Sequence, residues 1–170
     1  GLVPASLLGI DLTRLLESAQ RAALEFTAPT DNAAVKLGLF LGGWAAAGRD
    51  KATFLTSPTL ASFGAWVEQL IAESTGKEGK GILPVVGEPT ASPDPYGEDR
   101  VFVELARRGD PHDDDTISAL TRAGHPVVRI EVADLYELGR LFFLWELATA
   151  VAGRVLGINP FDQPNVESAK

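Results

Sequence analysis

Apolar residues along this chain change their spacing several times, and each change predicts a different kind of element. Helical periodicity and helix-boundary residues predict helices over 6–26, 31–47, 57–74, 113–122 and 134–156. Short apolar runs between them predict strands over 52–56, 81–86, 100–105 and 126–132. Short apolar strands that alternate with helices indicate a parallel sheet covered on both faces. We therefore predict an α/β fold, a three-layer αβα arrangement with a mostly parallel sheet.

Residues that favour helix ends support these boundaries. Pro58 stands at the favoured first position of its helix, and Gly76 and Gly124 follow helices as C-caps. Three aspartates at 113–115 suit a helix start, because carboxylates there interact favourably with the helix dipole. We interpret that run as a solvated helix start rather than as a metal site.

Composition narrows the class of protein. The chain has 170 residues, 45% of them apolar, which is enough for one domain with a sizeable core. A net charge of −8 argues against binding to nucleic acid or to an anionic membrane. The apolar stretch 141–151 is too short to cross a membrane and contains Glu146, and no signal peptide is evident. The chain has no cysteine, so it has no disulfide and no thiolate zinc site, which fits a reducing cytoplasm.

The sequence contains no methionine, although a natural reading frame begins with one. We therefore expect residues 1–170 to form a single subdomain of a longer protein.

Three polar clusters are candidates for chemistry, and we expect all three at the carboxyl ends of strands, where open α/β sheets bind ligands. The first contains Gln69 and Glu73, which share a helix face at i and i+4. The second is the loop that begins at 87–89, and the third is the last ten residues, 161–170. From pattern alone, a polar surface stripe explains the first cluster and a frayed acidic tail the third. Ser57-Pro58-Thr59 is a weaker candidate for an oxyanion site, and a plain Ser-Pro helix start explains it better.

These clusters resemble motifs of one enzyme family. Residues 69–77 have the pattern Q-x-x-x-E-S-x-G-K, residues 87–89 read G-E-P, and residues 161–170 have an F-D-Q, a V-E pair and a final lysine. In this order they resemble the C-terminal half of glucose-6-phosphate isomerases. The chain has a proline, Pro164, after Gln163 and lacks a histidine of the family pattern. In these two respects it is most similar to the isomerase half of bifunctional transaldolase/glucose-6-phosphate isomerase fusions. The resemblance implies a sugar-isomerase, flavodoxin-like αβα subdomain.

The resemblance also implies roles for particular residues. Glu73 would be the base that moves a proton between carbons 1 and 2 of the open-chain sugar. Lys170 would open the sugar ring, and Gln69 and Gln163 would position the substrate. The reaction would interconvert glucose 6-phosphate and fructose 6-phosphate through an enediolate, an aldose–ketose isomerisation that uses no metal or organic cofactor.

One position departs from the family pattern. The family's ring-opening histidine corresponds to Arg100, and arginine cannot shuttle protons because its pKa is too high. We expect Arg100 to contact an anionic oxygen or the phosphate of the substrate. The two histidines of the chain, His112 and His125, are predicted to be structural.

The expected partners follow from the same resemblance. They are a sugar-phosphate substrate and an N-terminal subdomain of the same protein, which would hold the phosphate-binding loops; the chain alone would be inactive. A non-catalytic sugar-phosphate-binding module with the same fold is the alternative. A third interpretation is a homodimerisation module that uses the apolar helix around 141–151.

Overall fold

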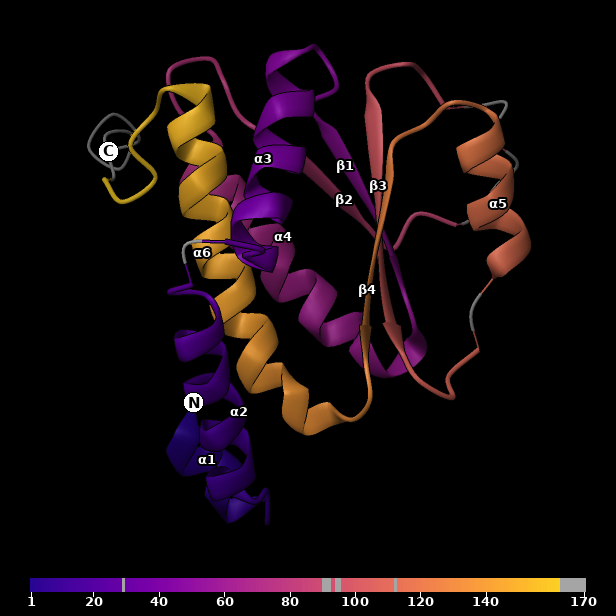
Figure 1. The fold of residues 1–170 in the computed structure, drawn as a ribbon. Coiled ribbons are helices and arrows are strands. Elements are labelled where there is room, and N and C mark those ends of the chain that lie inside the picture. Colours follow the sequence, from indigo (N-terminus) through magenta and orange to yellow (C-terminus); the bar gives the residue numbers. More distant parts are fainter. Residues whose placement is uncertain (29, 90–92, 94–95, 112, 163–170) are drawn as a thin grey trace, which may run out of the picture.

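A computed structural model describes the whole chain except residues 29, 90–92, 94–95, 112 and 163–170 (Figure 1). Helices and strands follow one another in the predicted order. The elements are α1 (Leu2–Leu7), α2 (Leu12–Glu25), α3 (Ala33–Ala46), β1 (Lys51–Thr56), the 3-10 turn η1 (Pro58–Leu60), α4 (Ala61–Thr75), β2 (Leu83–Val86), β3 (Arg100–Arg107), α5 (Asp114–Arg122), β4 (Val127–Val132), η2 (Leu135–Glu137) and α6 (Leu138–Leu156).

The four strands form one parallel sheet in the order β2-β1-β3-β4. Figure 1 shows α3, α4 and α6 on one face of this sheet and α5 on the other, with α1 and α2 beside α6. The predicted three-layer α/β fold is therefore confirmed. β2 lies at one edge of the sheet and pairs only with β1, with Pro84 opposite Ala52, among the strands that the structure describes.

Alternation along β3 divides its side chains between the two faces. Val101, Val103 and Leu105 belong to the main core under α3, α4 and α6. Phe102 and Glu104 are buried on the opposite face. Because a strand sends successive side chains to opposite faces, both sides of β3 are covered, as its nearly continuous apolar sequence requires.

Helix α6 supplies much of the core. Its side chains Leu141, Leu144 and Trp145 are buried, and Trp145 contacts Phe54 of β1 with ring centroids 5.5 Å apart. The apolar character of 141–151 is thus explained largely within this chain. Within the described residues, no helix has both the length and the apolar sequence needed to cross a bilayer.

The predicted single helix over 6–26 is wrong, because the chain breaks between α1 and α2. Gly9 adopts a φ of 78°, a left-handed conformation that glycine tolerates and a helix does not. Asp11 then caps α2, and its side chain accepts a hydrogen bond of 3.2 Å from the backbone N–H of Arg14. The periodic pattern included Asp11 in the helix, although its short carboxylate serves better at a helix start.

Gly139 allows α6 to cross α2 closely, since a Cβ there would collide with the carbonyl oxygen of Leu15. Gly139→Ala is therefore expected to lower the free energy of unfolding by about 1–3 kcal/mol through overpacking. Urea denaturation would measure the change. The matched control is Gly43→Ala on α3, where an added Cβ meets no atom within 4 Å. That exposed helix position should instead gain about 0.5–1 kcal/mol. Equal effects at the two positions would contradict this account of the crossing.

Candidate active site

Gln69 and Glu73 lie on the last two turns of α4, and both are exposed. The side-chain amide of Gln69 donates a hydrogen bond of 3.0 Å to Oε1 of Glu73. The predicted i, i+4 pairing is confirmed. Gln69 holds one carboxylate oxygen of Glu73, and the pair is open to a ligand.

The structure places this pair at the amino-terminal edge of the sheet. Helix α4 leaves the carboxyl end of β1 and returns to the amino end of β2, as a crossover between parallel strands must (Figure 1). The prediction that all three polar clusters lie at carboxyl ends is therefore wrong for the Glu73 cluster. It is also wrong for the start of the C-terminal cluster, because α6 returns to the same edge and Asp162 there contacts Lys77. A residue at the end of a crossover helix lies beside the start of the next strand.

A buried threonine fixes the end of α4 against β2. The Thr75 hydroxyl donates to the carbonyl of Ile71 at 2.8 Å and accepts from the N–H of Ile82 at 2.9 Å. Between them the chain makes a tight turn in which Glu78 and Gly79 have φ angles of 55° and 70°. The helix end that carries Glu73 is thus bonded directly to the residue that precedes β2.

Lys77 joins the Glu73 segment to the C-terminal motif. Its ammonium donates to the carbonyl of Asn159 at 2.8 Å and to Oδ1 of Asp162 at 3.0 Å. Two motifs that lie more than eighty residues apart in sequence therefore meet in the fold. Gln163 and Lys170 lie outside the described residues, so their predicted roles stay predictions. From the sequence, Lys77 was predicted only to match the family motif. Its place directly after Gly76, which ends the helix, could have indicated that its backbone is held in one position.

Arg100 lies on the α5 side of the sheet, because its neighbour Val101 belongs to the core on the other side. Its guanidinium donates to Oε2 of Glu88 at 2.6 Å and to the hydroxyl of Thr53 at 2.8 Å. It also lies 5.1 Å from the centre of the Tyr96 ring. The G-E-P loop and the position that replaces the family's histidine are thus in contact. The charge of Arg100 is paired within the chain, and contact with a substrate anion stays a prediction.

His125 packs beside the same cluster, with its ring 5.2 Å from that of Phe102 in an edge-on arrangement. Burial and the nearby charges of Arg49 and Arg100 lower the pKa of His125. A neutral, packed imidazole is in keeping with the structural role predicted for it. His112 lies outside the described residues.

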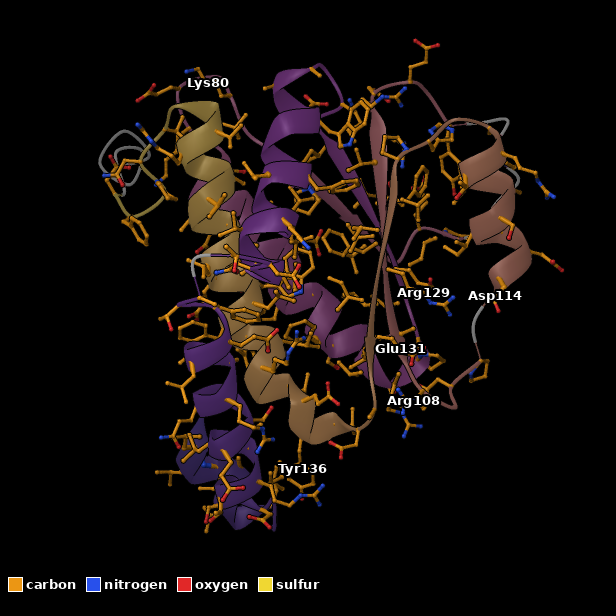
Figure 2. All side chains as sticks on the ribbon, in the orientation of Figure 1. Lys80, Arg108, Asp114, Arg129, Glu131 and Tyr136 are labelled. Carbon is orange, nitrogen blue, oxygen red and sulfur yellow. The ribbon has the colours of Figure 1, made fainter. Side chains whose placement is uncertain are left out.

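A hollow of about 320 Å³ opens at the carboxyl ends of β1 and β3 beside α5. Its lining includes Glu104 and Asp113, so it has acidic groups where a phosphate would need cations. Arg129 is the nearby cation, and it pairs with Glu104 at 3.1 Å and Asp114 at 2.9 Å (Figure 2). The lining of this hollow therefore does not suit a phosphate group.

The Ser57-Pro58-Thr59 turn lies at this same carboxyl edge. The Thr59 hydroxyl donates to the carboxylate of Asp110, and the Ser57 hydroxyl accepts from the N–H of Arg107 at 3.1 Å. Both hydroxyls are thus used within the chain. The structure favours the helix-start interpretation of this turn over an oxyanion site.

Asp110 gives a pH test of this carboxyl-edge network. The hydrogen bonds from Arg107 and Thr59 hold its pKa well below the ordinary value of 3.8. A carboxyl with a lowered pKa stabilises the fold above the unfolded pKa and loses that contribution as pH falls. The stability difference between wild type and Asp110→Asn should be largest near pH 7 and shrink below about pH 4. Urea denaturation from pH 7 to pH 2.5 measures this, and two parallel stability curves would contradict it.

A groove of about 640 Å³ lies at the amino-terminal edge beside the Glu73 segment. Its walls come from the turn after α4, the start of β2 and the end of α6. Figure 2 shows Lys80 at this edge, and its ammonium donates to the carbonyl of Leu156 at 3.3 Å. Within the part of the chain that the structure describes, no group of three or more acidic or histidine side chains could hold a metal ion.

Comparisons with known proteins show what the whole chain is similar to. No family model matches the chain. A glucose-6-phosphate isomerase of Heliobacterium modesticaldum is 31% identical over all of this chain and 47% of its own length. One from Rubrobacter xylanophilus is 32% identical over all of this chain and 49% of its own length. The chain thus spans about half the length of the curated relatives it matches, and the family resemblance predicted from the motifs is confirmed along the whole chain.

A solved structure supports the fold. A hypothetical protein of Thermus thermophilus superimposes with a TM-score of 0.83 over 99% of this chain and 51% of the other. The two sequences are 23% identical, so this likeness bears on the fold alone.

Proposed function

We propose that this chain is part of a glucose-6-phosphate isomerase, which in its full-length form interconverts glucose 6-phosphate and fructose 6-phosphate. The observation that carries the proposal is the meeting of the two motif segments. The helix end with Gln69 and Glu73 is joined through Lys77 to the segment that begins the C-terminal motif. The similarity to isomerases along the whole chain supports the same function.

In this proposal Glu73 is the base of the reaction. Its carboxylate removes the proton from carbon 2 of the open-chain aldose, which gives an enediolate. A proton passes from the carbon-2 hydroxyl to the carbon-1 oxygen, and Glu73 returns its own proton to carbon 1, which gives the ketose. Gln69 donates to Oε1 of Glu73 and so fixes the direction in which the carboxylate points. Gln163 and Lys170 follow directly on the segment held by Lys77, where Lys170 would open the ring and Gln163 would orient the sugar.

The rest of the parent protein would complete the site. Glu73 is exposed in this chain, and proton transfer through an enediolate needs a site that excludes water. We propose that a preceding subdomain covers Glu73 and holds the phosphate, so the chain alone is inactive. Arg100 would contact the substrate anion only by exchanging its pairing with Glu88 for the anion. A transaldolase fusion and a cytoplasmic location belong to the same proposal.

A coupled assay tests this function directly. The full-length protein is expected to convert fructose 6-phosphate to glucose 6-phosphate, detected through a dehydrogenase specific for the product. The isolated 170-residue chain, assayed at the same concentration, should show no turnover above background. A folded full-length protein that binds sugar phosphate without converting it would overturn the proposal and favour a non-catalytic binding module.

A further inference from the structure

Lys77 is a buried lysine, with only 5% of its side chain exposed. Lysines are rarely buried to this extent unless their charge is paired. All three donors of this ammonium have acceptors: the carbonyl of Asn159 at 2.8 Å, the carboxylate of Asp162 at 3.0 Å and the carbonyl of Asp162. Acceptors therefore surround the buried ammonium group of Lys77, unlike in an ion pair on the protein surface.

The backbone of Lys77 is itself held firmly. Its N–H donates to the carbonyl of Thr75 at 2.8 Å, and its own carbonyl accepts from the N–H of Lys80 at 2.9 Å. Thr75 is fully buried and bonded to both α4 and the approach to β2. The ammonium thus extends from a fixed point on the same helix end that carries Glu73.

The segment 159–162, which Lys77 binds, has few other attachments within the part of the chain that the structure describes. Pro160 lies against Gly153 of α6, where an added Cβ would meet its ring at 2.9 Å. The N–H of Phe161 donates to the side chain of Asn159 at 3.1 Å, and the Phe161 side chain is 82% exposed. The lysine is therefore the main polar link between the segment 159–162 and the helix end that carries Glu73.

We propose that Lys77 is a positioning residue, which holds the segment 159–162 against the helix end that carries Glu73. Gln163 follows Asp162 directly in the sequence, so the position of Asp162 bears on the role proposed for Gln163. This inference rests on the proposed isomerase function for its catalytic consequence, but the placement of the segment can be measured without any activity.

The first experiment measures that placement. Amide hydrogen exchange would be followed in the full-length protein for wild type, Lys77→Met and Lys36→Met. Lys77→Met is expected to raise exchange at least tenfold for the Phe161 amide and its neighbours, while β1 and β3 keep their protection. Lys36 is the control, since it is an exposed lysine on α3 that pairs with Asp31. Unchanged exchange around Phe161 in Lys77→Met would overturn the inference.

A second variant covers the case in which Lys77→Met does not fold. Asp162→Ala removes the carboxylate from a side chain that is 49% exposed, and it leaves both carbonyl acceptors in place. We expect it to raise exchange in the same segment by a smaller factor, about threefold. No increase in this variant would also count against the role of Lys77.

Kinetics separate positioning from a loss of folded protein. Lys77→Met is expected to lower kcat at least tenfold and to raise KM for fructose 6-phosphate at least fivefold, while Lys36→Met stays within twofold of wild type. Protein lost irreversibly to unfolding lowers the apparent kcat and leaves KM unchanged, whereas reversible unfolding raises the apparent KM. A rise in KM therefore reports misplacement of substrate-binding groups when circular dichroism shows that the variant is fully folded. Wild-type KM and kcat in Lys77→Met would overturn the positioning role. An inactive wild type would instead contradict the isomerase function, and the exchange data would still decide the role of Lys77.

Discussion

Glu73→Gln in the full-length protein is expected to lower kcat for isomerisation by about 100- to 10,000-fold, the usual contribution of a general base. Glutamine keeps the size of the side chain and its hydrogen bond with Gln69, but it cannot take a proton from carbon 2. KM should change much less, because the substituted group acts on the reacting carbons. Steady-state rates in both directions would measure the loss.

Glu78→Gln is the matched control for this prediction. Glu78 is an exposed carboxylate five residues along the chain, in the turn between α4 and β2. It should keep kcat within twofold of wild type. A full-length Glu73→Gln protein with wild-type turnover would show that another group is the base.

Trp145→Ala is expected to lower the free energy of unfolding by about 3–5 kcal/mol, the range for removing a large aromatic side chain from a core. Trp145 is fully buried on α6 and packs against Phe54 of the central strand β1. Its removal leaves a cavity between the helix layer and the sheet. Denaturant unfolding monitored by circular dichroism would measure the change.

Trp44→Ala provides the comparison for the same chemical change at an exposed place. Trp44 lies on α3 with 38% of its surface exposed, and its ring is 5.5 Å from the guanidinium of Arg49. The expected cost is about 1 kcal/mol or less, the scale of an exposed cation–π contact. Similar losses for both tryptophans would contradict the assignment of Trp145 to the centre of the core.

Local sequence patterns predicted the fold well because most element boundaries are marked by residues with strong preferences. Asn32 caps α3 by accepting from the N–H groups of Ala34 and Val35, and Gly157 ends α6 in a left-handed conformation. Each of these choices depends on neighbours within a few residues. Because strands and helices alternate along the chain, a parallel sheet was the arrangement that fitted all the predicted elements.

The candidate site was harder to predict, because its geometry depends on contacts between distant parts of the chain. The i, i+4 spacing of Gln69 and Glu73 was readable from the sequence, and their hydrogen bond is present. The edge of the sheet at which they lie was predicted incorrectly, since the rule for carboxyl ends was applied to a helix that returns to an amino end. The bond between Lys77 and Asp162 joins residues 85 positions apart, a contact that local periodicity does not report.

The edge strand β2 also bears on how this protein avoids aggregation. The N–H of Leu83 donates inward to the carbonyl of Asp50 at 2.8 Å, so the next residue, Pro84, turns its backbone nitrogen toward the open side of the strand. Proline has no N–H to offer there. A foreign strand that added itself to this edge would lack a donor in the middle of a four-residue strand. We expect Pro84→Thr or Pro84→Val to restore that donor and to make the chain more prone to intermolecular strand addition.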